Sequence, residues 1–201
     1  MTVAKRGRPR SFDREAALEQ AMRAFWRHGY DATSIADLTS AMSIGAPSLY
    51  AAFGDKRKLF EEVVEVYQRK YGIFSGRALA AEPTVREGAA RMLREAAAEY
   101  TDPDHPYGCL VISAGQNCTP ASADVEQMLR AIRTANIARL EELIEADIKA
   151  GLLPPETNAR QLAVFIGATM QGMSQQARDG ASRAELEAVA ETAMLGWPSP
   201  H

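Results

Sequence analysis

The 201-residue chain contains only two cysteines and three histidines, and this scarcity excludes several kinds of site. Cys109 and Cys118 have neither the spacing of a zinc-ligand pair nor the number needed for a disulfide framework. His105 could join them as a third metal ligand, but the loose spacing does not favour a metal site. We therefore expect no metal, no cofactor and reduced thiols, as in the cytoplasm.

Long hydrophobic runs are also absent. No apolar segment approaches the roughly 18 residues that suggest a membrane span. The basic start MTVAKRGRPR is not followed by the apolar region of a secretory signal. Hydrophobic residues nevertheless make up 46% of the chain, enough to bury a core. We expect a cytoplasmic protein without a membrane partner.

Motifs of common enzymes are missing as well. The chain has no Gly-rich phosphate loop, no H-E-x-x-H, no Glu-x-x-His pair and no G-x-S-x-G. With so few histidines, no remaining group of residues indicates catalysis. We predict that the protein is not an enzyme.

The charge that is present is unevenly distributed. Residues 1–60 carry ten Lys and Arg against six Asp and Glu, an excess of four, whereas the remaining 13 basic and 20 acidic residues leave an acidic body. Such a division favours a basic module that meets nucleic acid. A charged, solvated helical surface is the alternative.

Residues 13–53 carry start and stop signals for three short helices. Asp13 can cap the first, which ends at Gly29. Ser34, followed three residues later by Asp37, begins the second, and the third starts after the break SIG and ends at Gly54. The short separation of the last two helices and the small residues that begin the third fit a helix-turn-helix, with an ordinary helical hairpin as the alternative.

The stretch HGYDATSIADLTSAMSIGAPSLYAAFGDKRKLF, residues 28–60, resembles the DNA-binding signature of the TetR family of bacterial transcriptional regulators. The shared features are the Gly-aromatic-x-x-Thr entry, the Leu-Tyr-x-x-Phe end of the third helix and the Lys after the next turn. The likeness is dense over residues 12–60, and beyond them only the helical architecture matches.

The resemblance implies a role for each matching position. Thr33 and Ser34 would face a phosphate, and Tyr50 and Lys56 would bind phosphates on either side of a groove. Ser48 and the backbone of Gly45, Ala46 and Pro47 would face base edges. Phosphate contacts would position the helix, and base contacts would select the sequence.

Two departures from the family pattern leave the third helix with fewer side-chain contacts to DNA, so the N-terminal arm should contribute more of them. Gly45 stands where many relatives have Ser or Thr, and Ala51 stands where an aromatic residue or His is common. The arm KRGRPR is extended because Gly is permissive and the residue before Pro avoids the α region. We expect Arg6, Arg8 and Arg10 to enter a minor groove, with a solvated basic tail as the alternative.

Residues beyond 60 are also predicted to be helical nearly throughout. Asp55 can cap a long helix that ends near Gly72–Gly76, and Thr84 starts another. Residues 101–108 form a loop, and the apolar stretch 109–118 is taken as a helix. Further helices are expected from Thr119 to about 150, over 158–178 and from 182 onward.

The helix over 158–178 contains the run LAVFIGATMQGM, which is apolar on more than one face. One face can cover the chain's own core, and the other suits close packing against a second copy. With the last helix it would form the four-helix interface of a two-fold dimer, as the resemblance also implies. Burial inside one monomer is the alternative. The expected interface residues are Ala163, Gly167, Gln171, Ser174, Leu186, Val189 and Ala193.

Bulky, aromatic and sulfur-containing side chains on the inner faces of the body suggest a pocket for an apolar or aromatic effector. An ordinary core is the alternative for each of them. Cys109, in the sequence HPYGC, resembles a Gly-Cys of several TetR-family proteins, some of which respond to electrophiles, although a buried inert cysteine is also possible. The expected pocket residues are Tyr67, Tyr71, Phe74, Met92, Tyr100, Cys109, Ile112, Asn136, Phe165 and Met170.

These observations predict an all-α protein in three parts. Residues 1–12 form a flexible basic arm, residues 13–60 a three-helix helix-turn-helix head, and residues 61–201 a larger effector-binding and dimerisation domain. The expected function is a ligand-responsive repressor that binds a palindromic operator as a dimer and is released by a small molecule. Two alternatives stay open, a constitutive DNA-binding protein without an effector and a thiol-based electrophile sensor that uses Cys109.

Overall fold

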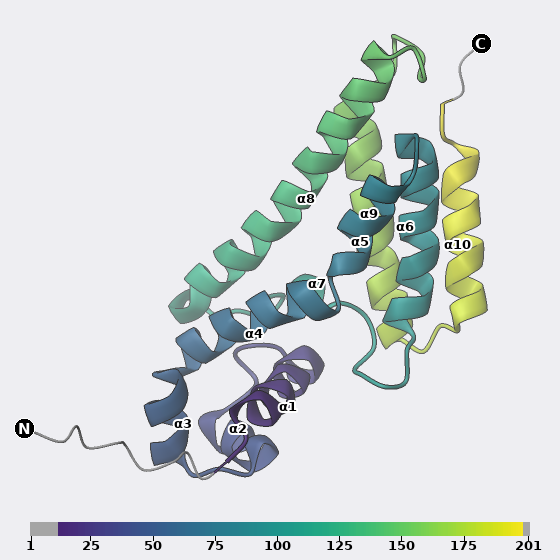
Figure 1. Cartoon of the computed structure of the whole chain (residues 1–201). Coiled ribbons are helices and arrows are strands. Elements are labelled where there is room, and N and C mark those ends of the chain that lie inside the picture. The colour runs from purple at the N-terminus through teal and green to yellow at the C-terminus, as the bar shows by residue number, and fades with distance from the viewer. Residues whose placement is uncertain (1–11, 199–201) are drawn as a thin grey trace, which may run out of the picture.

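The structure, a computed structural model, describes residues 12–198, and within this range it contains helices and no strands (Figure 1). The all-α prediction is therefore confirmed. The helices are α1 (Arg14–His28), α2 (Ile35–Met42), α3 (Ala46–Phe53), α4 (Lys56–Lys70), α5 (Ile73–Ala81), α6 (Val85–Tyr100), α7 (Leu110–Ser113), the 3-10 turn η1 (Pro120–Ser122), α8 (Ala123–Lys149), α9 (Ala159–Arg178) and α10 (Arg183–Leu195).

Local capping explains where most of these helices begin. The carboxylate of Asp13 accepts hydrogen bonds from the backbone N–H groups of Glu15 and Ala16 at the start of α1. Ser34 begins α2 and Ser182 begins α10, each with a complete capping box. These side chains satisfy N–H groups that a helix leaves unpaired at its N-terminus, so the start signals are confirmed.

Two predicted helices have different bounds. The helix from Asp55 ends at Lys70, and the chain bends at Gly72 and continues as the separate helix α5, which includes Gly76. The expected helix over 109–118 is helical only from Leu110 to Ser113. After Ser113 the backbone leaves the helical path. The carbonyl of Ala114 there accepts a 2.9 Å hydrogen bond from the N–H of Tyr30.

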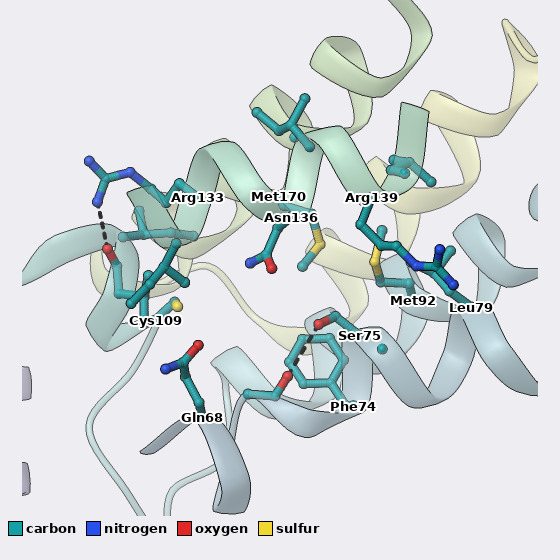
Figure 2. A pocket seen from close by; sticks show the side chains of 18 of the residues that line it. Gln68, Phe74, Ser75, Leu79, Met92, Cys109, Arg133, Asn136, Arg139 and Met170 are labelled. Atoms are coloured by element: carbon teal, nitrogen blue, oxygen red, sulfur yellow. Dashed lines mark hydrogen bonds between the residues drawn. The ribbon is translucent and has the colours of Figure 1, made fainter. Parts of the chain in front are cut away.

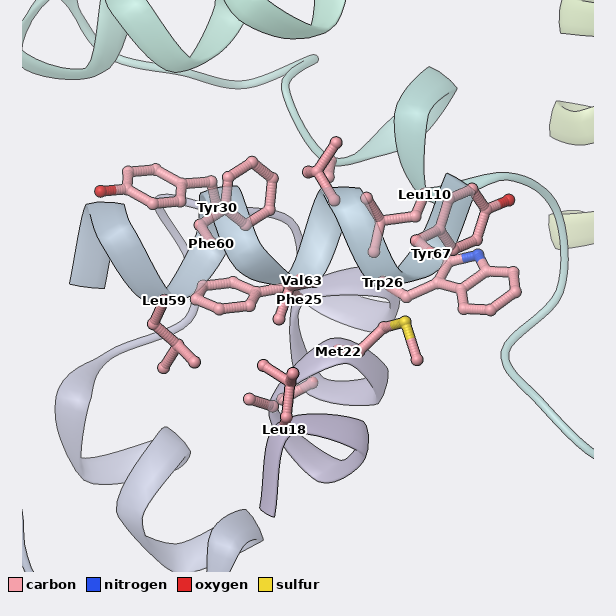
Figure 3. Packing of buried hydrophobic residues seen from close by; sticks show 14 of the residues in the cluster. Leu18, Met22, Phe25, Trp26, Tyr30, Leu59, Phe60, Val63, Tyr67 and Leu110 are labelled. Atoms are coloured by element: carbon pink, nitrogen blue, oxygen red, sulfur yellow. The ribbon is translucent and has the colours of Figure 1, made fainter. Parts of the chain in front are cut away.

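The buried side chains form two clusters. The first holds α1–α4 together and includes Leu110 of α7 and the beginning of α8. Figure 3 shows its centre, where Phe25 packs edge-on against Phe60 with ring centroids 4.9 Å apart, and Trp26 does so against Tyr67 at 4.8 Å. Because α4 and α7 belong to the same cluster, the head is packed directly onto the body.

The second cluster joins α5, α6, α8, α9 and α10. In Figure 1, α6, α9 and α10 run side by side, and the long helix α8 slants from the top of this group down towards α4. Among the described residues, no helix is both long enough and apolar enough to cross a bilayer. The body is therefore built from helices that come from widely separated parts of the chain.

Candidate nucleic-acid interface and internal cavity

Helix α3 is anchored on one face and open on the other. Leu49 and Phe53 are buried against the head. On the opposite face Gly45 and Pro47 are exposed, and Tyr50 is 48% exposed. Gly45 supplies no side-chain cap and Pro47 has no N–H, so the backbone at the N-terminus of α3 has little side-chain cover. Ala46 and Ser48 lie half-buried beside this face.

Lys56, at the start of α4, is a half-buried cation held over an aromatic ring. Its Nζ lies 4.3 Å from the centroid of the Tyr30 ring. Burial lowers the pKa of Lys56, and the charge of Asp31 opposes this shift only in part. Within residues 12–198 no carboxylate lies at ion-pairing distance from it. Lys56 is therefore oriented without being neutralised, which suits a phosphate contact.

The start of α2 differs from the expected arrangement. Thr33 is fully buried, and its hydroxyl donates a 2.6 Å hydrogen bond to the carbonyl of Gly29. Its side chain therefore stabilises the turn and does not face outward. Ser34 is exposed, but its hydroxyl is engaged with Asp37 in the capping box. Arg6, Arg8 and Arg10 lie outside the described residues.

The turn between α2 and α3, at the predicted break SIG, contains a left-handed residue that the sequence did not indicate. Ser43 has φ 53°, and it is the only non-glycine residue with positive φ in the described part of the chain. This left-handed conformation costs a non-glycine residue free energy, and it turns the chain sharply from α2 into α3. The sequence carried no signal for it, because Gly or Asn is the usual choice at such a position.

A cavity of about 550 Å³ opens between α4, α5, α6, α8 and α9 (Figure 2). Most of the predicted pocket residues line it: Tyr67, Phe74, Met92, Tyr100, Cys109, Ile112, Asn136 and Met170. Two predicted residues do not. Tyr71 packs against Trp26 and donates a 2.8 Å hydrogen bond to Glu19, while Phe165 is 46% exposed on α9. Tyr71 lies at the C-terminal end of α4 and faces the head, and Phe165 lies on the outer side of α9 and faces solvent.

The cavity wall also contains polar residues that were not predicted. They are Gln68, Ser75, Arg77, Arg133, Arg139 and Gln171. In Figure 2, Asn136 and Gln68 point towards the same space from opposite sides. Arginine and glutamine on helices are usually solvated, so periodicity alone gives no signal that they line a cavity. The wall is thus apolar over most of its area, with amide and guanidinium groups placed around it.

Cys109 is a half-buried part of the same wall. Burial raises the pKa of its thiol, although a hydrogen bond with Tyr67 acts in the opposite direction. Its backbone N–H donates a 2.9 Å hydrogen bond to the hydroxyl of Ser174.

His105, the third candidate metal ligand, stacks on Trp26 with ring centroids 4.6 Å apart. In the described chain, no group of three His, Cys, Asp or Glu residues is arranged to hold a metal ion.

The predicted dimer residues do not share one exposed face. Ala163, Ser174, Leu186 and Ala193 are buried in the core of the chain itself, and Gly167 lines the cavity. Gln171 and Val189 are exposed. The small residues of α9 were expected outside, but they point inward because α6 and α8 pack closely there. The exposed apolar side chains of α9 and α10 are Val164, Phe165, Val189 and Leu195.

Comparison with known proteins decides the family. Residues 17–63 match the family model for bacterial regulatory proteins of the tetR family, and residues 85–193 match that for the tetracyclin repressor-like C-terminal domain. The chain is 36% identical over 194 residues to the HTH-type transcriptional repressor ComR of Escherichia coli strain K12, covering 96% of this chain and 92% of ComR. The chain belongs to the TetR family.

Other relatives of this TetR-family protein agree. It is 33% identical to the HTH-type transcriptional repressor BdcR of Escherichia coli strain K12, covering 93% of this chain and 90% of BdcR. A cysteine mutant of the TetR-family regulator CifR, solved with a 26-base-pair operator DNA, superimposes with a TM-score of 0.91 and 42% identity, covering 96% of this chain and 100% of that one. As a member of a family of transcriptional regulators, the protein is not an enzyme, as the sequence indicated.

Proposed function

We propose that this TetR-family protein is a repressor that binds a palindromic operator as a homodimer and is released by a small apolar or aromatic molecule. The exposed face of α3 carries this proposal, because Leu49 and Phe53 anchor the helix while Gly45 and Pro47 stay open. ComR and BdcR are named as repressors, and CifR is complexed with operator DNA. The cytoplasm is the compartment in which such a regulator meets DNA.

In this function, the small residues of α3 allow its backbone to approach the floor of a major groove. Ser48 and the backbone of Gly45 to Pro47 face base edges, and Tyr50 and Lys56 bind phosphates on either side. The N-terminal arm reaches the adjacent minor groove. Ser34 and the N–H groups at the start of α2 bind a further phosphate, whereas Thr33 supports them from inside.

A dimer supplies the second head that a palindrome requires. Val164 and Phe165 of α9 and Val189 of α10 are exposed, and their burial against a second copy would remove apolar surface from water. We assign DNA binding to residues 13–60 and effector binding and dimerisation to residues 61–201. Two-fold symmetry places the heads about one helical turn of DNA, or a multiple of it, apart.

Release of DNA is proposed to start at the cavity. Cys109 and Ile112 line it, and Ala114, a few residues later, accepts the hydrogen bond from Tyr30 in the head. A ligand that displaces α7 would therefore move one head relative to the other. The ligand lowers operator affinity only by as much as it prefers the displaced state.

Salt-dependent operator binding tests the DNA-binding surface. Lys56→Ala and Tyr50→Phe should each weaken binding, and Lys56→Ala should reduce the slope of log K against log salt by about 1, since one phosphate contact is lost. Lys149→Ala is the matched control, because Lys149 is 80% exposed at the far end of α8. Unchanged affinity and slope in both head variants would refute the proposed surface.

A constitutive DNA-binding protein without an effector is the competing function. The cavity of about 550 Å³ favours the ligand-responsive form, since it falls in the size range of small-molecule sites. A thermal-shift screen distinguishes the two. A compound that stabilises the protein and also releases operator DNA supports the ligand-responsive repressor, and the absence of any such compound in a broad apolar and aromatic library supports the constitutive protein.

A further inference from the structure

The charged groups in the cavity wall are all of one sign. Arg77, Arg133 and Arg139 line the cavity, and no Asp or Glu of the described residues does. Two of these arginines are neutralised outside it. Arg77 pairs with Glu95 at 2.8 Å, and Arg139 pairs with Glu142 at 3.3 Å.

Arg133 differs from the other two. Its guanidinium is half-buried and donates a 2.7 Å hydrogen bond to the carbonyl of Val111 (Figure 2). Nowhere in residues 12–198 does a carboxylate come within 4 Å of it, the distance that defines an ion pair. Arg130, one turn earlier on α8, adds to the positive charge around it but is itself paired with Glu126. Glu126 acts on Arg133 from a greater distance, but no carboxylate of the described residues pairs with Arg133 directly.

Such an arrangement costs free energy. A guanidinium remains protonated at all ordinary pH values, so it cannot escape burial by losing its charge. Burial, followed by the neighbouring charge of Arg130, lowers the pKa of Arg133. Partial burial of a cation without a directly paired carboxylate is unfavourable, and an anion bound beside it would offset that cost. Its planar set of donors matches a carboxylate or sulfonate in particular.

The rest of the wall determines what the anion must carry. Phe74, Met92 and Met170 bring aromatic and thioether surface to the same space, which requires an apolar body. Asn136, almost one turn after Arg133 on α8, points its amide into the cavity and can donate to a further polar group of the ligand. A cationic ligand finds no carboxylate there, and the arginines repel it.

We propose that the cavity selects an amphipathic anion, an aromatic or aliphatic body with one carboxylate or sulfonate group that pairs with Arg133. This inference rests on the proposed effector function for its biological role and defines the chemical class of the effector. Neutral molecules of the same shape bind more weakly, and cationic ones are excluded.

A matched pair of fluorescent probes tests the proposal on the full chain. Anilinonaphthalene sulfonate and N-phenylnaphthylamine share an apolar aromatic body and differ by the sulfonate. Arg133→Gln should weaken binding of the sulfonate probe at least tenfold and change that of the neutral probe less than twofold. Arg130→Gln is the control, since it removes the same charge from the same helix outside the cavity. Arg133→Lys should retain part of the preference, and thermal unfolding confirms that each variant is folded.

Three outcomes would overturn the proposal in different ways. Equal affinity of the sulfonate probe for the wild-type protein and Arg133→Gln would reject the anion assignment and leave the repressor function intact. An equal loss in Arg130→Gln would show only a general electrostatic effect. Failure of both probes to bind the wild-type protein would reject the cavity as a ligand site and, with it, the ligand-responsive part of the proposed function.

Discussion

The carboxylate of Asp31, in the turn between α1 and α2, accepts a 2.6 Å hydrogen bond from the backbone N–H of Thr119, 88 residues later in the chain. The same carboxylate accepts a 2.5 Å bond from the hydroxyl of Ser122 in η1. Next to it, Arg57 of α4 pairs with Asp124 of α8 at 2.6 Å. The head is thus tied by polar bonds to the segment that leads from the cavity into α8.

Removing the Asp31 hydrogen bonds of this connection should weaken the coupling between the head and the cavity. Asp31→Ala eliminates both hydrogen bonds, and we expect a loss of about 1 kcal/mol of stability, because the carboxylate is only partly enclosed. The ratio of operator affinities without and with a releasing ligand should fall several-fold, since that ratio measures the coupling. Asp179→Ala, an exposed change at the end of α9, is the control. An unchanged ratio would show that the signal takes another route.

Thr33 provides a test that separates stability from DNA binding. Thr33→Val leaves the carbonyl of Gly29 without its donor and should cost about 1–2 kcal/mol of unfolding free energy. Thr33→Ser keeps the hydroxyl and should be close to wild type. Neither variant should alter the salt dependence of operator binding by the folded protein. If Thr33→Val reduced the slope of log K against log salt by about 1, Thr33 would contact a phosphate after all, as the family resemblance implied.

The loop before Cys109 has little room for a side chain. Gly108 has φ +78°, and a Cβ added there would lie 2.7 Å from the carbonyl oxygen of Ser174. Gly108→Ala should therefore destabilise the protein by about 2–4 kcal/mol through backbone strain and overlap together. Gly151→Ala shares a positive φ of +74° but meets no atom within 4 Å, so it should cost only about 1 kcal/mol. Urea unfolding of both variants measures the difference.

His105 should make stability depend on pH. Burial alone would lower its pKa, but the Glu99 carboxylate 3.3 Å away and the Pro106 carbonyl raise it, and the net shift is upward. A raised pKa in the folded state stabilises the protein fully below the unfolded-state value, about 6.5. This contribution disappears as pH rises through the folded-state pKa. Urea unfolding from about pH 6 to 9 should show the decline, and Glu99→Gln should flatten it, whereas Glu65→Gln should not.

Cys109 should react slowly, because burial raises the pKa of its thiol and little nucleophilic thiolate forms at neutral pH. We expect iodoacetamide to modify it at least tenfold more slowly in the folded than in the urea-unfolded protein, measured by mass spectrometry of the peptide. Cys109→Ser should retain ligand-induced operator release. Rapid alkylation together with loss of the response in Cys109→Ser would favour the electrophile sensor instead.

The helix starts and the helix-turn-helix could be predicted from the sequence because their causes are local. Asp13, Ser34 and Ser182 cap N–H groups within three residues of themselves, and Gly29 and Gly54 end helices through their own backbone freedom. The spacing of Leu49 and Phe53, four residues apart, already indicates in the sequence which face of the third helix is buried. These features need no knowledge of the rest of the fold.

The direction in which an individual side chain points was decided only by tertiary packing. Tyr71 and Phe165 were expected in the pocket and lie outside it, while Ala163 and Ser174 were expected at an interface and lie in the core. Arg133 has the sequence context of a solvated helical arginine, and only the fold places the carbonyl of Val111 and the cavity beside it. The run LAVFIGATMQGM in α9 is apolar on more than one face, so the neighbouring helices determine which side becomes core, cavity or surface.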